Sequence, residues 1–441
     1  MNAEVRQIRT AAEQGLLDAF PALKDRLPGK GAIAERRSAA FRRFETHGLP
    51  HRRVEEWKYT DLRALMRDAK PLASPPDAQA RRLAADSKVL PGIDARRLVI
   101  INGAFVPELS DLADLEPGLS VQPLAAALSK GDAFVTERLG KTVPVDDVAV
   151  ALNTAFMGDG VVIRVAEGAR IVRPIRLVHA FSGEAAAVFT RSLVVVEPRA
   201  QLILIETHEG PDAVGYQIND AVELVVGDGA DVDYIKVGAE GSQALHVASL
   251  LATVGAKARL QTFAFTTGGA VTRNQTFLCL AGQNVTAAIR GATLLSGHQH
   301  VDTTLVVDHA AVGGVSRELF KSVLDGESRG VFQGKIIVRP GAQKTDGKMA
   351  SHALLLSDDA EADNKPELEI FADDVQCGHG ATSGALDEDL LFYLKARGIP
   401  TKEAEALLIQ SFVGEAIEQI EHEGVREALI AVTEQWLKAR G

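Results

Sequence analysis

Two residues in the last quarter of the sequence combine ligand types that bind iron. Cys377 and His379 lie two positions apart in the segment DDVQCGHGATSG, among small residues. A thiolate and an imidazole both bind iron and iron-sulfur species. If the segment is a β-strand, alternate side chains point to the same face, so one metal ion could contact both residues. On spacing alone, a buried cysteine beside a hydrogen-bonded histidine is the simpler interpretation.

Other histidines rank below this pair. His298 and His300 in SGHQHVD would also share a strand face, although a solvated loop explains them better. His352 precedes an apolar run and is interpreted as a residue at a strand end. Three further histidines have no neighbour in the sequence that indicates a ligand set: His208, His246 and His309.

Common catalytic and nucleotide-binding motifs are missing from the sequence. It contains no GxxxxGK[ST], no GxGxxG between a strand and a helix and no HExxH, and its one match to GxSxG, GESRG at Gly326 to Gly330, leads into the strand-like run VFQGKIIV rather than into a helix. Glycines instead occur in short turn-like runs such as VGDGA at Val226 to Ala230. The motifs therefore favour neither a nucleotide-binding protein nor a hydrolase.

The elements that must position the Cys377–His379 pair form a repeat. After Arg96, short β-branched runs such as GVVIRVAEG and RSLVVVEP are separated by Gly, Asp or Pro. Their turn-like segments align on Ala169, Ala200, Ala230, Ala258 and Asn284, with separations of 31, 30, 28 and 26 residues. A recurrence of this length predicts stacked coils that share one core, a β-helix-like solenoid over residues 96–385. A β-sandwich or propeller with chance spacing is the alternative.

Helices are predicted on both sides of the solenoid. Residues 1–95 show a helical period, and LASPPDAQA at Leu72 to Ala80 is predicted as a linker because adjacent prolines stop a helix. Asp387 begins a C-terminal helix that ends near Gly398. A second helix from about Lys402 carries an apolar stripe: Ile409, Phe412, Val413, Ala416, Ile417 and Ile420. This stripe either packs on the end of the solenoid or binds a partner.

Composition restricts the partners and the compartment. The 441 residues include 48 Lys and Arg against 59 Asp and Glu, a formal net charge of −11, and aromatic residues make up 5%. Nucleic acid is therefore not expected as a partner. Glu4 and Glu13 interrupt the first apolar residues, so no secretion signal is expected, and no stretch is long enough to span a membrane. Two cysteines without a disulfide pattern favour the cytoplasm.

Long motifs resemble a known family. The chain is similar to the SufB/SufD family of iron-sulfur cluster assembly proteins over its whole length, most closely from about Phe320 onward. The matching segments are EEWKYTDL (Glu55 to Leu62), SRGVFQGKIIVRPGAQKTDG (Ser328 to Gly347), LLLSDDAEADNKPELEIFADDVQCGHGAT (Leu354 to Thr382) and LLFYLKARGIPTKEAEALLIQSF (Leu390 to Phe412).

Within this family the chain resembles the SufD branch. SufB typically has a histidine in an EHEAT segment, where this sequence reads GHGAT at Gly378 to Thr382. SufB also has an acceptor cysteine where this sequence has Ala350, Ser351 and His352. A SufB-like paralogue is the alternative within the family.

The resemblance implies an architecture, partners and site residues. It implies a right-handed parallel β-helix over residues 96–385, between helical domains at 1–95 and 386–441. It also implies a cytoplasmic SufBCD complex of one SufB, one SufD and two copies of the ATPase SufC, in which this chain is a scaffold and not an enzyme. The C-terminal helices would dock SufC, through Leu407, Phe412, Val413 and Ile417 as candidates. The last coils, near Phe371 to Thr382, would pair with SufB.

The same resemblance makes His379 the leading candidate ligand for iron or a transient iron-sulfur cluster at the SufB interface, with Cys377 close by. A flavin on the assembled complex is a further expectation, and no tightly bound cofactor is expected on the isolated chain. Since SufB and this chain would pair through one edge, the isolated chain is expected to form a homodimer through it. The competing class is a polysaccharide-active β-helix enzyme, which should show paired carboxylates on one face and a secretion signal.

Overall fold

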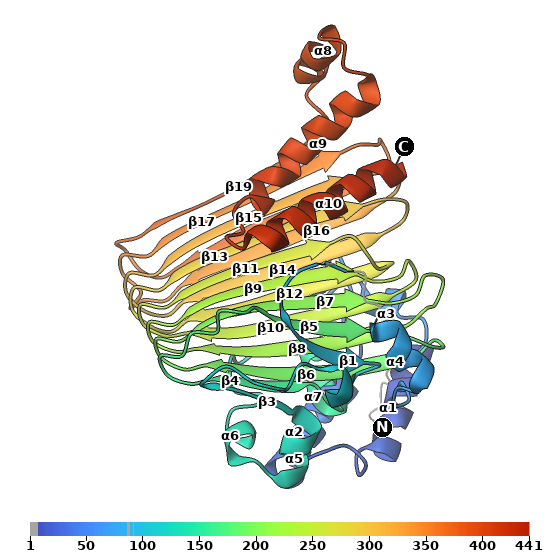
Figure 1. Cartoon of the computed structure of the whole chain (residues 1–441), viewed down its shortest axis with the longest axis vertical. Coiled ribbons are helices and arrows are strands. Elements are labelled where there is room, and N and C mark those ends of the chain that lie inside the picture. Colours follow the sequence, from blue (N-terminus) through green and yellow to red (C-terminus); the bar gives the residue numbers. More distant parts are fainter. Residues whose placement is uncertain (1–7, 86–88, 91, 441) are drawn as a thin grey trace, which may run out of the picture.

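The chain folds into a parallel β-solenoid with helices at both ends (Figure 1). The computed structural model describes residues 8–85, 89–90 and 92–440; residues 1–7, which belong to the predicted N-terminal helical region, lie outside this part. Two sheets face each other. Sheet A contains β3 (Leu119–Pro123), β4 (Val161–Val165), β6 (Ala187–Val196), β8 (Gln217–Val226), β10 (Leu245–Val254), β12 (Val271–Leu280), β14 (His300–His309), β16 (Arg329–Val338) and β18 (Glu361–Ile370).

Sheet B contains the strands that alternate with these along the chain. They are β2 (Ala104–Phe105), β1 (Arg96–Ile101), β5 (Ile175–Ala180), β7 (Gln201–Glu209), β9 (Asp231–Ala239), β11 (Arg259–Thr266), β13 (Thr286–Leu295), β15 (Val315–Leu324), β17 (Asp346–Leu355) and β19 (Gln376–Gly384). From β4 onward each strand pairs in parallel with the strand two places further along the chain. The predicted parallel solenoid flanked by helices is confirmed.

The same turn recurs at one corner of seven consecutive coils. A residue with φ between 56° and 76° recurs at Gly168, Arg199, Gly229, Lys257, Asn284, Gly313 and Lys344. Its backbone N–H donates to a carbonyl of the following coil over 2.7–2.9 Å, so these turns form a ladder along the solenoid. In four predicted turns the aligned alanine directly follows this residue. Asn284 instead has the positive φ itself, so the predicted alignment was one residue out at that coil.

The core lies between the two sheets and is apolar at the corner just described. On β7, for example, Leu202 and Leu204 point inward and are buried. Because side chains alternate along a strand, Glu206 and His208 continue the same inward row. The opposite corner of the interior is therefore polar, and this difference determines where buried charges gather.

The N-terminal helices cover the outer face of sheet A. They include α1 (Ala11–Leu23), α2 (Ala32–His47), the 3-10 turn η1 (Glu55–Trp57) and α3 (Leu62–Leu65). The next helix, α4 (Ala78–Ala85), lies instead on sheet B, where Ala80 packs with residues of β1 and β5. Three more helices are inserted between β3 and β4: α5 (Leu124–Lys130), α6 (Ala133–Thr136) and α7 (Val148–Phe156). The phenylalanines of α1, α2 and α7 pack together against β10. The sequence analysis assigned this insertion to the solenoid, so the 96–385 segment is not all strand.

The EEWKYTDL segment anchors the N-terminal region on the solenoid. Trp57 is buried, and its Nε1 donates to Asp147 Oδ2 over 2.8 Å. The guanidinium of Arg273 on β12 lies 3.8 Å from the centre of the indole ring and pairs with the buried Asp302 of β14. Thr60 donates to the same carboxylate over 2.5 Å. This motif is therefore explained by packing rather than by chemistry.

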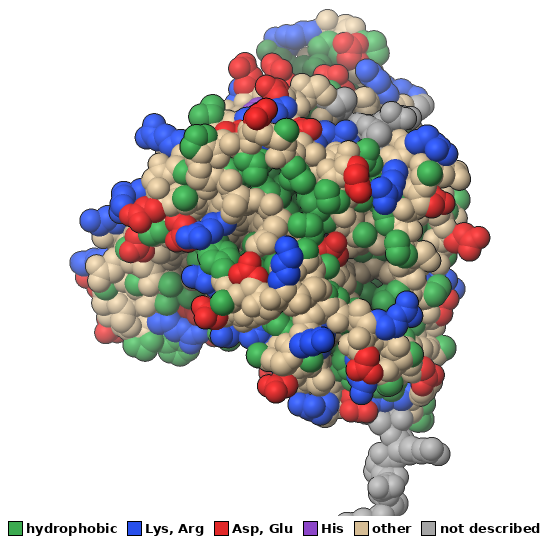
Figure 2. Space-filling view, turned by 60° about the horizontal axis from the view of Figure 1, so that its bottom comes forward, with side chains coloured by type: hydrophobic (Ala, Val, Ile, Leu, Met, Phe, Trp, Pro, Cys, Tyr) green, Lys and Arg blue, Asp and Glu red, His purple; other side chains and the backbone are tan. Residues whose placement is uncertain are grey.

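Three helices follow the solenoid: α8 (Glu388–Ala396), α9 (Thr401–Ile417) and α10 (Glu423–Arg440). Residues of α9 and α10 pack on the outer face of sheet B. The predicted start of α8 is confirmed, because the side chain of Asp387 accepts from the backbone N–H groups of Asp389 and Leu390. In Figure 1, α9 and α10 lie along the sheet while α8 projects beyond it. Figure 2 shows acidic and basic side chains interspersed over the face that it views. No described helix has the length and apolarity needed to cross a membrane.

Candidate functional site

Cys377 and His379 both lie on β19, the last strand of sheet B. In its register with β17, Cys377 is opposite Gly347 and His379 is opposite Met349. Met349 belongs to the solenoid core, and Cys377 packs partly against that core. Both predicted ligands therefore continue the inward-facing rows, on one face as predicted. His379 is exposed because the described chain places no further coil over this end.

The thiol and the imidazole differ in their surroundings. Burial raises the pKa of the Cys377 thiol above its ordinary value, and the carboxylates of Asp346 and Glu318 act in the same direction. A metal ion would therefore have to displace a proton from the sulfur before binding it. Cys279 lies on β12 of the other sheet, so the structure does not bring the two cysteines into one site.

The end of the solenoid is open in both sheets. Within the described chain, β18 pairs only with β16 and β19 pairs only with β17. Each of these strands thus presents backbone donors and acceptors along its outer edge. Ile370 and Phe371, which end β18 and follow it, are 41% and 59% exposed. The open end therefore combines free hydrogen-bonding groups with apolar side chains and the Cys377–His379 pair.

The candidate docking residues of α9 face different ways. Val413 and Ile417 are fully buried against sheet B, so they stabilise the fold and leave no surface for a partner. Phe412 packs beside them, with the Lys321 ammonium 4.4 Å from its ring centre. Only Leu407 is well exposed, at 42%. The prediction that all four form one docking face is therefore corrected: most of the stripe packs on the solenoid, the alternative left open above.

The exposed apolar side chains of this region belong mainly to α8. Leu390, Phe392 and Tyr393 are 50%, 73% and 52% exposed, and none of the residues of α8 is buried. These three side chains of α8 are called the α8 face.

Four of the lower-ranked histidines are separated from one another. His298 lies in an exposed turn beside Glu327, whereas His300 begins β14 and its Nε2 is 2.8 Å from the hydroxyl of Thr60. His352 on β17 contacts the hydroxyl of Thr382. The buried His309 contacts only Ser316, over 2.9 Å. The structure does not assemble a ligand set around any of them.

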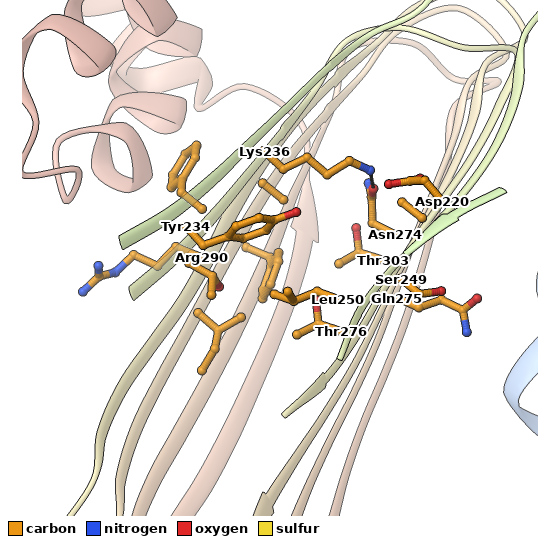
Figure 3. Close-up of a pocket in the computed structure, with 16 residues that line it drawn as sticks. Asp220, Tyr234, Lys236, Ser249, Leu250, Asn274, Gln275, Thr276, Arg290 and Thr303 are labelled. Atoms are coloured by element: carbon orange, nitrogen blue, oxygen red, sulfur yellow. Dashed lines mark hydrogen bonds between the residues drawn. The ribbon is translucent and has the colours of Figure 1, made fainter. Parts of the chain in front are cut away.

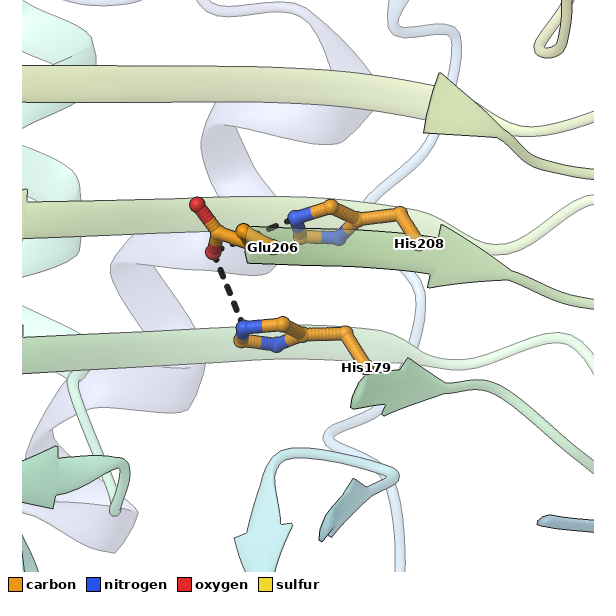
Figure 4. A group of neighbouring side chains, drawn as sticks. All are labelled: His179, Glu206 and His208. Carbon is orange, nitrogen blue, oxygen red and sulfur yellow. Dashed lines mark ion pairs between the residues drawn. The ribbon is translucent and has the colours of Figure 1, made fainter. Parts of the chain in front are cut away.

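A buried cluster in the polar half of the interior was not predicted from the sequence. His179 of β5 and Glu206 and His208 of β7 form one group, and His208, Asp220 of β8 and His246 of β10 form another (Figure 4 shows the first group). In each group one side-chain N or O atom per residue lies within 4.8 Å of the others. Up to 67 residues separate these histidines in sequence, so only the stacking of coils brings them together. The sequence gives one indication of the cluster: the alternating strand pattern predicts that these side chains point inward.

Electrostatics within the cluster keep its carboxylates ionised. Burial acts to raise the pKa of Glu206, but His179 and His208 outweigh it and hold this pKa well below its ordinary value. The pKa of Glu240 is about 2, because His246 outweighs the effect of burial. Burial lowers the pKa of His208 to about 4, so its imidazole is neutral at physiological pH.

A small cavity adjoins the cluster between the two sheets (Figure 3). Its volume is about 40 Å³, and Asp220, Tyr234 and Lys236 are among its lining residues. Lys236 donates to the Asn274 side-chain oxygen across the cavity over 2.9 Å. A space of this size beside polar side chains can hold one water molecule.

Comparisons with known proteins identify the family. Residues 179–412 match the family model for the SufBD core domain of the SUF iron-sulfur cluster assembly system, and residues 13–177 match the model for the SufBD N-terminal region. The chain is 31% identical over 384 residues to an iron-sulfur cluster assembly SufBD family protein of Synechocystis, covering 84% of each chain. It is also 31% identical over 390 residues to the iron-sulfur cluster assembly protein SufD of Escherichia coli, covering 87% of this chain and 88% of that one. The chain belongs to the SufBD family of iron-sulfur cluster assembly proteins.

Proposed function

We propose that this chain is the SufD-type scaffold of a SufBCD complex and has no catalytic turnover of its own. Its open solenoid end pairs with a SufB partner, and the α8 face docks the ATPase SufC. Iron or a nascent iron-sulfur cluster is the cargo, bound by His379 and Cys377 at the SufB boundary. The observation that carries the proposal is the position of these two ligand types on the last strand, at the uncovered end of the core. The family matches favour this function over polysaccharide chemistry.

The edges of β18 and β19 support pairing with another β-rich chain. A strand of a partner can hydrogen-bond to an exposed sheet edge, and side chains beside the edge then give specificity. Here Phe371 supplies a large exposed apolar side chain next to that edge. Burying such a side chain contributes about 2 kcal/mol to association. His379 would then lie at the boundary between the two chains, where a partner can supply further ligands.

The α8 face supports a second, separate interface. A short helix with no buried residue that carries Leu390, Phe392 and Tyr393 is typical of a surface covered by another protein. α8 leads directly into α9, which is fixed on the solenoid. An ATPase bound to α8 could therefore transmit its movement through α9 to the β-solenoid. This movement would change the SufB interface at β18 and β19.

Co-purification tests the two interfaces independently. The tagged chain would be co-expressed with SufB and SufC partners, and each partner would be quantified after purification. Phe392→Asp should remove SufC and retain SufB, whereas Phe371→Asp should remove SufB and retain SufC. Val172→Asp is the matched control, because Val172 is 84% exposed on an earlier coil. Retention of both partners by both variants would refute the proposed docking surfaces.

A further inference from the structure

Two histidine rings and one carboxylate converge inside the solenoid, in a region that the proposed function does not use. His179 and His208 are opposite each other on β5 and β7, and their rings stack with centres 4.3 Å apart. Glu206 lies two positions before His208 on β7 and therefore points to the same side of the strand. Figure 4 shows both rings directed toward this carboxylate. We call these three residues the inner histidine site.

The distances in the inner histidine site match those between ligands of one metal ion. Nε2 of His179 lies 2.9 Å from Glu206 Oε1, and Nε2 of His208 lies 3.2 Å from the same oxygen. With metal–ligand bonds of about 2.0–2.1 Å, neighbouring ligand atoms are roughly 2.9–3.4 Å apart in octahedral or tetrahedral coordination. Both distances fall in that range.

The same atoms pair with one another, but not in hydrogen-bond geometry. His179 Nε2, His208 Nε2 and Glu206 Oε1 are all buried and form the two ion pairs just given, yet none of the three meets the geometry of a hydrogen bond with any partner. The side chains of His179, Glu206 and His208 are 9%, 1% and 0% exposed. Leaving a buried polar atom unsatisfied costs about 1–3 kcal/mol. Three such atoms directed at one point therefore suit a ligand that all three would share.

Surrounding residues fix the carboxylate and add negative charge. The hydroxyl of Tyr234 donates to Glu206 Oε2, which leaves Oε1 directed at the two imidazoles. An outer hydrogen bond of this kind is typical of metal-ligating carboxylates. The neighbouring His246 is already hydrogen-bonded on both nitrogens, to Asp220 and to Glu240. Hydrogen bonds therefore already satisfy His246, whereas His208, which belongs to both groups, has none and is assigned to the inner histidine site.

We propose that His179, Glu206 and His208 bind one divalent first-row transition-metal ion, such as Fe(II) or Zn(II), inside the solenoid. Two imidazole nitrogens and one carboxylate oxygen suit these ions and leave coordination positions open. The inner histidine site lies six strand steps from β19 in sheet B, a separation of roughly 29 Å. It is therefore distinct from the Cys377–His379 pair and does not depend on the proposed complex.

Cobalt binding tests this site. The full chain, carrying Cys377→Ser and His379→Ala to remove the surface ligands, would be refolded with Co(II) and freed of excess metal. Bound cobalt would be measured by elemental analysis and by visible absorption, which reports imidazole coordination. One Co(II) per chain is expected, with at least a tenfold loss of affinity in His208→Gln and Glu206→Gln.

His309→Gln is the matched control, because His309 is equally buried in the same solenoid but contacts only a serine. It should retain full cobalt binding. Circular dichroism would identify any variant that does not fold. If His208→Gln does not fold, the cobalt binding of the conservative Glu206→Gln variant decides the test. Absence of cobalt from the parent chain, or equal binding by the Glu206→Gln and His309→Gln variants, would overturn the proposal.

Discussion

Glu318 gives a quantitative test of how the interior near β19 is organised. It lies on β15, one strand below Met349 and two below His379 in the same inward row. The residue is 3% exposed, and neither carboxylate oxygen has a hydrogen-bond partner. Burial raises its pKa from 4.5 to about 7, although Ser316 and Arg317 act to lower it.

The sign of the pH effect follows from this raised pKa. Below about pH 4.5 the carboxyl group is protonated in both the folded and the unfolded chain. Between 4.5 and about 7 the folded chain keeps the proton and the unfolded chain releases it, so the free energy of unfolding falls as pH rises. Above pH 7 the Glu318 carboxyl group is ionised in the folded chain as well, and the loss of unfolding free energy is complete. At about 1.36 kcal/mol per pKa unit, that loss is about 3 kcal/mol.

Urea unfolding of Glu318→Gln between pH 4 and pH 8.5 would measure this effect. The difference in unfolding free energy between the variant and the parent should shift in favour of the variant by about 3 kcal/mol from low to high pH. Glu327→Gln, at a carboxylate that is 65% exposed, serves as the control and should show little change with pH. A difference between Glu318→Gln and parent that does not vary with pH would refute the reasoning.

Three further predictions concern packing and assembly. Val413→Ala should lower the unfolding free energy by about 2 kcal/mol, because Val413 is fully buried against sheet B; equal urea midpoints would contradict this. The isolated chain should form a homodimer through β18 and β19 that Phe371→Asp dissociates, and light scattering that finds only monomer in the parent at high micromolar concentration would count against it. In the complex, ATP should change the yield of crosslinks placed across the boundary near His379, whereas unchanged yields would exclude nucleotide-driven opening.

Much of the fold could be predicted from the sequence because local patterns determine it. The turn recurs where a residue takes positive φ, and the alternating strands between turns specify which side chains point inward. The alignment was one residue out at Asn284, because the residue after the positive-φ position in that turn is Val285 and not an alanine as in the four other turns. The α5–α7 insertion was missed because its helices are short and depend on packing against α2.

The candidate sites were predictable to different degrees. Cys377 and His379 are two residues apart on one strand, so their shared face followed from the strand period alone. His179, His208 and His246 come from three strands, and only the coil lengths decide that they meet. The stripe on α9 was recognised, but a sequence pattern does not say whether an apolar face packs on its own chain or on a partner.

Cluster yield in the assembled complex tests the central role given to β19. The chain carrying His379→Ala would be co-expressed with its SufB and SufC partners, purified without oxygen and scored by cluster absorbance per complex. His352→Ala is the matched control, because His352 lies on the adjacent strand β17 and contacts only Thr382. We expect His379→Ala to lose most of the cluster absorbance while His352→Ala retains it. Full cluster yield in an intact His379→Ala complex would contradict the account.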